Sequence, residues 1–432
     1  MKELRTKFIK SLSEYKLWLA SFGLMLLIVA GTFSSIFTYL AFALAVVSII
    51  FLSENNAMAL IMFCMSFANI FKASTGAQSF FTYLILLFVL ICVIRYGKFN
   101  STFLCAMMIF VLFLLIQMPF SANILRTIKF IANIFIIYYV TILLDQKQYS
   151  KIFIAYVLGV IIASTIAASG LIPNLADFIG SKELGNMYGE EARFSGLYPD
   201  PNYYSTNVII SLCLLVILNF KKKLNAVVSI FLAVLLIAFS IMTFSKSAFL
   251  MLVLPTILLI YSKIKCKRYF LAVGITVFVV AVIVAVLSGK IEALEIVIAR
   301  FKEADDLSSL TTGRSDIWLY YIEYLFDNPL VFFFGRGFGA DMLGRAAHNT
   351  YIDLFYYLGL VGVVILVAVF ILIIRQSQRS SKYNFLNFGI WICVACMYFF
   401  LSQMFYFDWA FHITIAILVA KMNMNPIAEV RK

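Results

Sequence analysis

Long apolar runs recur from one end of this sequence to the other. About fourteen of them, each roughly 14–26 residues long, carry almost no charge. A helix needs about 20 mainly apolar residues to cross the hydrocarbon core of a bilayer, because each residue adds only about 1.5 Å of rise. Hydrophobic residues make up 63% of the chain and charged residues 13%, whereas soluble proteins have about half and about a quarter. The chain is therefore predicted to be an all-α polytopic membrane protein with about 12–14 transmembrane helices, and soluble folds are excluded.

The lengths of the apolar runs set the predicted spans. They cover residues 17–33, 35–52, 57–71, 79–94, 102–118, 127–144, 152–172, 203–220, 224–243, 247–262, 269–288, 349–374, 385–403 and 407–420. The N-terminal segment, with Lys2, Arg5, Lys7 and Lys10 ahead of Leu17, resembles a signal peptide. No small-residue cleavage site clearly follows, and further apolar runs come at once. We therefore predict that this segment is a first membrane helix.

The net charge of +13 is distributed between the apolar runs rather than gathered on one surface. If both termini are cytoplasmic, about 22 of the 34 lysines and arginines fall in inner segments, including the runs 221–223 and 263–268. Most acidic residues fall on the other side. This distribution follows the positive-inside rule and predicts cytoplasmic termini. Because no basic stripe with interleaved aromatic residues lies on a polar domain, nucleic acid is excluded as a partner.

Two connections are long in a chain whose other connections are short. They cover residues 173–202 and 289–348, and both are predicted to be extracytoplasmic. They divide the chain into three groups of transmembrane helices, at 1–172, 203–288 and 349–432. Long loops in an otherwise economical protein are usually functional or disordered.

The second loop contains a predicted helix that begins at residues 315–316. Trp318, Tyr321, Ile322 and Leu325 follow at helical spacing. We expect this helix to lie at the membrane interface with its apolar side toward the bilayer.

The first loop ends in a sequence that predicts a rigid turn. Gly196, Pro199 and Pro201 restrict the backbone, and Asn202 is expected to cap the helix that follows. Arg193 offers a planar, permanently charged guanidinium group that suits phosphate oxygens. A stable turn with an arginine that reaches toward the interface explains the segment equally well.

Lys246 lies in a very short turn between two predicted spans, on the outer side. A lysine in an outer turn is an exception to the positive-inside rule, which indicates a functional role. An ordinary interfacial lysine explains it nearly as well.

The second loop ends at one of the two histidines of the chain. His348 stands where the loop meets a span, and an imidazole can accept or donate a proton near neutral pH. His412 lies inside the last predicted span, where a structural role is favoured. The glycines at 335–339 are too irregular for a nucleotide-binding fingerprint. Cys393 and Cys396 form a C-x-x-C inside an apolar span without histidine partners, so ordinary helix residues are favoured over a metal or redox site.

Several cations and a histidine thus converge on one predicted membrane face beside apolar helices. Arg193, Lys246, Arg314 and Arg336 are the cations, and His348 is the candidate base. A lipid-linked phosphate or pyrophosphate would need this arrangement, because cations bind the phosphates, apolar helices accommodate the tail and a base activates the acceptor.

The order of the motifs resembles that of the O-antigen ligase and polymerase superfamily, over roughly residues 190–365. The matching motifs are R-F-S-G at 193–196, D-P-N at 200–202, Ser245-Lys246 in a tight turn, Gly313-Arg314 with Trp318 after it, a G-x-G ahead of H-N-x-Y at 348–351, and G-x-x-G at 359–362. The resemblance implies a metal-independent, inverting glycosyltransferase of the GT-C type that needs no cofactor.

The resemblance also implies roles for particular residues. Arg193 and Arg314 would hold the pyrophosphate of a glycan carried on undecaprenyl pyrophosphate, and His348 would orient or deprotonate the acceptor hydroxyl. Lys246 departs from the arginine that relatives often have, and lysine lacks the bidentate fork. The substrate-binding residues are expected to be Lys246, Asp200, Asn202, Arg336, Asn349 and Tyr351.

Three functions remain open at this stage. We favour a polymerase that moves a growing glycan onto the next lipid-linked repeat unit at the outer face of a bacterial inner (plasma) membrane. A ligase would move the finished glycan onto lipid A-core instead. A flippase for lipid-linked oligosaccharides would need polar groups within the helix bundle, whereas the charges here gather at the outer edge. Membrane lipids, a chain-length regulator and a flippase are the expected partners of a polymerase.

Overall fold

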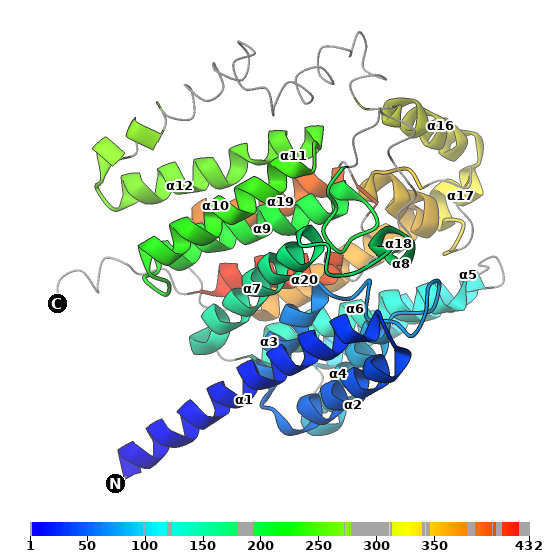
Figure 1. Ribbon diagram of the computed structural model, residues 1–432. Helices are drawn as coiled ribbons and strands as arrows, with labels where there is room; N and C mark the ends of the chain where they lie inside the picture. The colour runs from blue at the N-terminus through cyan, green and yellow to red at the C-terminus, as the bar shows by residue number, and fades with distance from the viewer. Residues whose placement is uncertain are drawn as a thin grey trace. The chain divides into compact units, whose positions relative to one another are not determined.

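The computed structural model describes most of the chain and shows it to be helical. The described residues are 2–97, 100–118, 123–144, 146–179, 193–271, 273–275, 277, 311, 313–338, 342, 346–377, 385–399, 401–402 and 408–422. Within these ranges the secondary structure consists of helices and turns, with no strand (Figure 1).

The helices follow the apolar runs closely. Their bounds are α1 (Lys2–Gly31), α2 (Ser35–Phe51), α3 (Glu54–Met65), α4 (Phe80–Tyr96), α5 (Ser101–Gln117), α6 (Ile124–Leu143), η2 (Gln146–Gln148), α7 (Tyr149–Ala168), α8 (Leu175–Ile179), α9 (Pro201–Phe220), α10 (Ala226–Met242), α11 (Lys246–Met251), α12 (Val253–Lys265), α16 (Arg314–Asp327), α17 (Pro329–Phe334), α18 (Thr350–Ser377), α19 (Phe385–Phe399) and α20 (Asp408–Lys421). The run at 269–288 lies mostly outside the described residues.

Five stretches of the described chain are long and apolar enough to cross a membrane. They are Ile124–Leu143, Tyr149–Ala168, Pro201–Phe220, Lys246–Lys265 and Thr350–Arg375. Six further apolar helices have 10–17 residues. The prediction of an α-helical protein with membrane-spanning helices is therefore confirmed at this coarser level.

The predicted span at 57–71 is wrong in its second half. Helix α3 ends at Met65, and residues 66–72 form hydrogen-bonded turns instead. Phe67, Ile70 and Phe71 are fully buried in these turns. A buried apolar turn and a buried helix have the same composition, so the run of apolar residues could not separate them.

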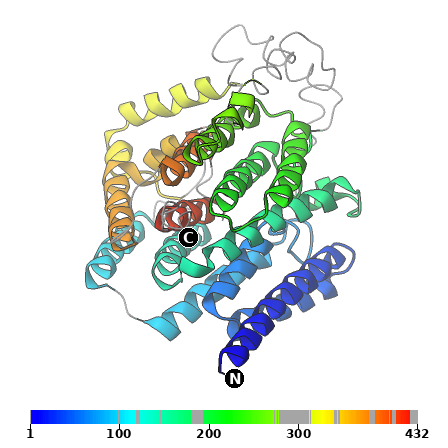
Figure 2. The same cartoon turned by 90° about the vertical axis from the view of Figure 1, so that its left-hand side faces the viewer.

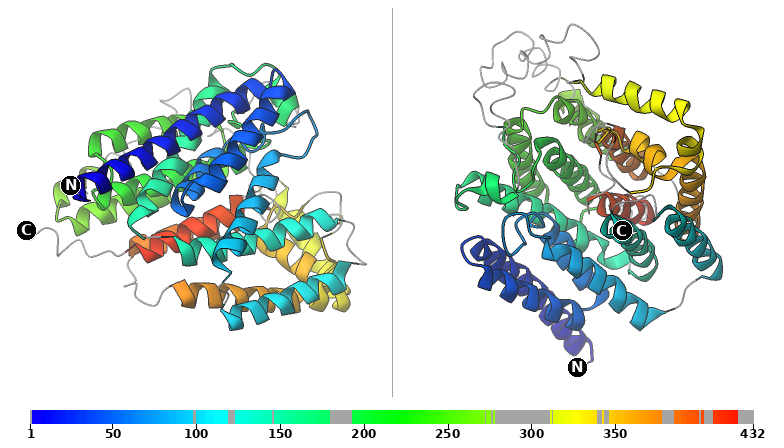
Figure 3. Two further views of the ribbon diagram at one scale, coloured as in Figure 1. Left: turned by 90° about the horizontal axis from the view of Figure 1, so that it is seen from below. Right: turned by 90° about the vertical axis from the view of Figure 1, so that its right-hand side faces the viewer.

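The chain forms two compact units. Unit 1 contains residues 1–97 and 138–243, and unit 2 contains residues 98–137 and 244–432. In unit 1, α1 and α2 lie side by side (blue in Figure 3), and so do α9 and α10 (green in Figure 2).

Helices α3 and α7 of unit 1 pack very closely. A Cβ atom on Gly159 would lie 3.1 Å from the Cα of Phe63, so glycine permits the two backbones to approach. Polar side chains then join α7 to α9. The Tyr156 hydroxyl donates to Oδ1 of Asn207 at 2.8 Å, and the hydroxyls of Ser164 and Tyr204 lie 2.6 Å apart. These bonds hold α9 in place, and α9 carries part of the candidate site at its first turn.

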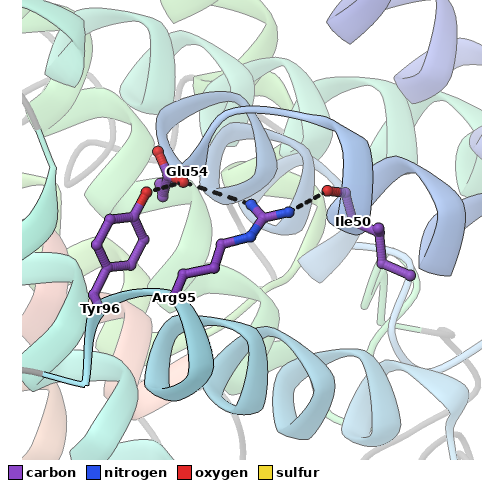
Figure 4. Close-up of polar contacts among 4 residues, drawn as sticks. All are labelled: Ile50, Glu54, Arg95 and Tyr96. Carbon is purple, nitrogen blue, oxygen red and sulfur yellow. Dashed lines mark hydrogen bonds and ion pairs between the residues drawn. The ribbon is translucent and has the colours of Figure 1, made fainter.

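An ion pair and two hydrogen bonds join the ends of three helices in unit 1 (Figure 4). Glu54 begins α3, and its carboxylate lies 3.6 Å from Nη1 of Arg95 near the end of α4. The Tyr96 hydroxyl donates to the same carboxylate, and Arg95 also donates to the carbonyl of Ile50 in α2. Because every group in this cluster has a partner within it, we assign it to holding α2, α3 and α4 together.

Candidate functional site

Arg193 is docked on the end of a helix in unit 1. Its Nε donates to the carbonyl of Thr243 at 3.0 Å, and the Phe194 amide donates to the carbonyl of Met242 at 3.1 Å. The Phe194 ring stacks on Phe239 and meets the edge of Tyr204. The last carbonyls of α10 thus receive donors from this segment, which also places a cation at the negative end of the helix dipole.

The turn that follows depends on glycine. Gly196 has a φ of 57°, and a Cβ atom there would lie 2.6 Å from Cε2 of the buried Tyr204 ring. The backbone of R-F-S-G therefore passes directly over α9, where only glycine fits.

Asp200, rather than the predicted Asn202, caps α9. Oδ1 of Asp200 accepts the backbone N–H of Asn202 at 2.6 Å and its side-chain amide at 2.8 Å. Asn202 is already inside the first helical turn, after Pro201 at N1. The prediction that Asn202 is the cap is therefore wrong, and the Asp-Pro pair was the better signal, since an acidic cap followed by proline is a common start of a helix.

Lys246 is the first residue of α11, in unit 2. Phe244 has a φ of 46°, and Ser245 caps the helix by accepting the Ala248 amide at 3.3 Å. The Ser247 hydroxyl lies 2.9 Å from that of Ser245. Lys246 is half-buried in this tight turn.

His348 is held in a left-handed backbone conformation. Its φ is 53°, a left-handed value that is unfavourable for most residues other than glycine and asparagine. Asn349 follows and caps α18, because its Oδ1 accepts the amides of Tyr351 at 3.0 Å and Ile352 at 3.2 Å. The His348 side chain is half-buried and lies where the second loop meets α18.

Two side chains hold the peptide groups just before His348. The Trp318 indole donates to the carbonyl of Ala347 at 2.9 Å, and Oδ1 of Asp353 accepts the Ala347 amide at 3.1 Å. Asp353 is completely buried in the first turn of α18. The residue before His348 is therefore fixed on both sides, which maintains the strained conformation of the histidine.

The same helix supplies Trp318 and Arg314. Arg314 is the first residue of α16 and Trp318 lies four residues later, so the two side chains project from the same face one turn apart. Because Trp318 is bonded to Ala347, α16 brings half-buried Arg314 to the neighbourhood of His348. Of the predicted catalytic residues, Arg314 and His348 belong to one local structure in unit 2, whereas Arg193 belongs to unit 1.

Helix α16 confirms the helix predicted in the second loop, and its position at the membrane interface stays a prediction. Tyr321 and Leu325 are buried, and Tyr321 meets the edge of Tyr356 in α18 at 5.0 Å between ring centroids. Part of the expected apolar side, Tyr321 and Leu325, therefore packs on the protein, whereas Ile322 of the same side is exposed. The exposed apolar residues of α16 are Leu319, Tyr320, Ile322 and Phe326.

Arg336 lies beside a break in α18. Gly359 has φ 64° and ψ 178°, which interrupts the helix. The freed carbonyl of Tyr356 accepts the Arg336 amide at 2.8 Å, and the carbonyl of Tyr357 accepts the Gly337 amide at 2.9 Å. The span predicted at 349–374 is thus present as α18, but the helix is broken at Gly359, and a neighbouring loop satisfies the backbone groups of the break.

Three further contacts complete this junction. Gln117 of α5 donates to the carbonyls of Phe334 and Tyr357. Nη1 of Arg336 donates to the Tyr324 hydroxyl at 2.9 Å, and the arginine is otherwise exposed.

Three of the predicted substrate-binding residues also have a structural role. Asp200 and Asn349 are helix caps, and the Tyr351 hydroxyl donates to the carbonyl of Ala395 in α19 at 3.0 Å. Their capping and packing contacts give each a structural reason to be present. Asp353 was not predicted, although an acid in the first turn of an apolar span, just after a histidine, was a signal for it.

No cluster of three or more His, Cys, Asp or Glu side chains suited to a metal ion occurs in the described part of the chain. Comparisons with protein-family models, with curated proteins and with solved structures gave no match.

Proposed function

We propose that this protein is a glycosyltransferase of the bacterial inner (plasma) membrane that extends a polysaccharide. In this proposal it transfers a growing glycan from undecaprenyl pyrophosphate onto a lipid-linked repeat unit at the outer face. The proposal rests on the two hydrogen bonds that Trp318 and Asp353 form with the peptide groups of Ala347. They hold His348 in a strained conformation and link it to α16, the helix of Arg314. Strain of this kind clusters at functional sites.

The chemistry assigns a separate task to each group. The acceptor hydroxyl attacks the anomeric carbon, and the bond from that carbon to the pyrophosphate oxygen breaks with inversion. His348 takes the proton of the hydroxyl. Arg314 stabilises the negative charge that develops on the departing pyrophosphate, and Arg193 is proposed to share this role. Membership of the GT-C type and of the O-antigen ligase and polymerase superfamily is part of the same proposal.

Two other functions use the same surface differently. A ligase would differ only in its acceptor, lipid A-core. A flippase is favoured by one observation, the break of α18 at Gly359, because broken helices line substrate pathways in many transporters. Here Gln117 and the 335–337 loop satisfy the broken segment, which favours a static junction.

The first experiment is a gel of surface polysaccharide from a deletion strain and from the same strain with the intact gene. We expect lipid A-core with a single repeat unit in the deletion strain and a full ladder after complementation. Bare core with long polymer on the carrier lipid would establish a ligase. Repeat units that stay on the inner face would establish a flippase and contradict the proposal.

Asp353 is expected to act as a positioning residue. Asp353→Ala removes the acceptor of the Ala347 amide and should lower chain extension by about 10- to 100-fold, because the His348 turn loses one of its two anchors. Asp353→Asn keeps a carbonyl oxygen at that position and should retain most activity. The readout is the rate of chain extension in membranes with equal amounts of each variant. Equal activity in Asp353→Ala and the intact protein would contradict this role.

A further inference from the structure

Lys72 is a buried cation that the sequence pattern did not single out. It follows the turns after α3, in the connection between α3 and α4, and only 8% of its surface is exposed. Its Nζ lies 5.3 Å from the centre of the Phe178 ring. With the residues that the structure describes, the ammonium group makes no hydrogen bond and no ion pair.

Burial of this lysine is electrostatically unfavourable. Removal from water lowers the pKa of the Lys72 ammonium group below its ordinary value. Asp177, the neighbour of Phe178 in sequence, is exposed and forms no ion pair with it. An aromatic face offsets the cost of burying a cation only in part, and an anionic partner that forms hydrogen bonds with the cation offsets more of it. The environment of Lys72 is thus suited to an anion.

The place of Lys72 in the chain connects it to the first long loop. Phe178 belongs to α8, which lies in the same loop as Arg193. Lys72 is at the end of the α3 segment opposite to Glu54, so the proposed topology puts it on the outer side. The turn at residues 74–76 is exposed beside it, which leaves this part of the connection open to its surroundings.

We infer that Lys72 binds phosphate, as a subsite for the diphosphate headgroup of a polyprenyl-linked glycan. This inference rests on the proposed function and adds a cation from unit 1 to the predicted arginines. Lysine binds phosphate as a point charge, which requires no bidentate geometry. The diphosphate headgroup carries several negative charges at the end of an apolar chain. Lys72 is a buried cation over the ring of Phe178, so its charge is suited to such a headgroup.

The test compares binding of undecaprenyl pyrophosphate to the purified full-length protein and to variants. Lys72→Met preserves the length of the side chain and removes the charge, and we expect about tenfold weaker binding. Lys72→Arg should restore most of the affinity. Lys223→Met, at an exposed lysine of unit 1 between α9 and α10, is the matched control and should bind like the intact protein.

Two further measurements separate the alternatives. Because Lys72 is buried without an acidic partner among the described residues, Lys72→Met should unfold at the same temperature as the intact protein or higher. A lower unfolding temperature together with unchanged affinity would show a structural lysine and overturn the inference. Phosphatidylglycerol is the second probe, and an equal loss of its binding would show a general site for anionic lipids, which also overturns it. If the intact protein does not bind undecaprenyl pyrophosphate, the proposed function fails as well. If the intact protein binds it and Lys72→Met binds equally, only the inference fails.

Discussion

Chain extension is expected to stop in cells whose only copy of the gene carries His348→Asn, while the amount of protein in the membrane stays unchanged. Asparagine tolerates the left-handed backbone that His348 adopts at φ 53°, so the turn before α18 should form normally. It cannot take a proton from the acceptor hydroxyl. A general base contributes about 10²- to 10⁴-fold to such reactions, which is enough to remove the polysaccharide ladder from a gel.

The choice of replacement separates the chemistry of His348 from its conformation. His348→Ala also removes the imidazole but is strained at this φ, so it tests both properties together. Arg314→Ala should likewise abolish extension, whereas Arg268→Ala, at an exposed arginine beyond α12, should not. A normal ladder from His348→Asn would show that the position requires only a left-handed backbone, and the catalytic assignment would be abandoned.

Replacement of Gly359 by alanine should prevent unit 2 from folding. A Cβ atom at this position would lie 2.6 Å from the carbonyl carbon of Phe333, and one at Gly335 would lie 2.6 Å from the amide nitrogen of Gly359. Both overlaps involve backbone, which cannot turn aside as a side chain can. Gly359 also has a φ of 64°, which is unfavourable for alanine. Together these effects should cost about 4 kcal/mol or more, a large part of the stability of most domains.

The measurement is the yield of monodisperse protein after detergent extraction, followed by thermal unfolding. Gly359→Ala and Gly335→Ala should both accumulate poorly. Gly274→Ala is the matched control, because a Cβ atom there would meet nothing within 4 Å. Normal yield and stability for Gly359→Ala would mean that α18 runs without the break and that the junction with Arg336 is not formed.

The sequence alone determined where most helices lie. Apolar runs of membrane-spanning length predicted helices at nearly every described position, and the 3.6-residue spacing around Tyr321 predicted α16. This success has a simple cause. Helix formation and burial in an apolar medium depend on local composition and periodicity, and both can be read along the chain.

Ends and faces of helices were harder to predict. The end of α3 at Met65, the cap at Asp200 and the break at Gly359 depend on which backbone groups find partners nearby. The packing of α16 on α18 depends on a neighbour that lies about 35 residues away in the chain, at Tyr356. Apolar character was a poor guide to its orientation, because both sides of this helix are apolar.

The sequence also supplied the residue types of the candidate site, since cations and a histidine between apolar runs can be recognised without a structure. Their meeting across the two units stays a prediction. Only the tertiary structure decided that Trp318 and Asp353 hold the peptide groups before His348, and that Phe178 covers Lys72. The Trp318 and Phe178 contacts join residues 29 and 106 positions apart, and Asp353 lies six residues from Ala347 in a turn that the sequence does not reveal. The local sequence pattern does not predict such contacts, because they form only when separate segments of the chain pack together and their buried polar groups find partners.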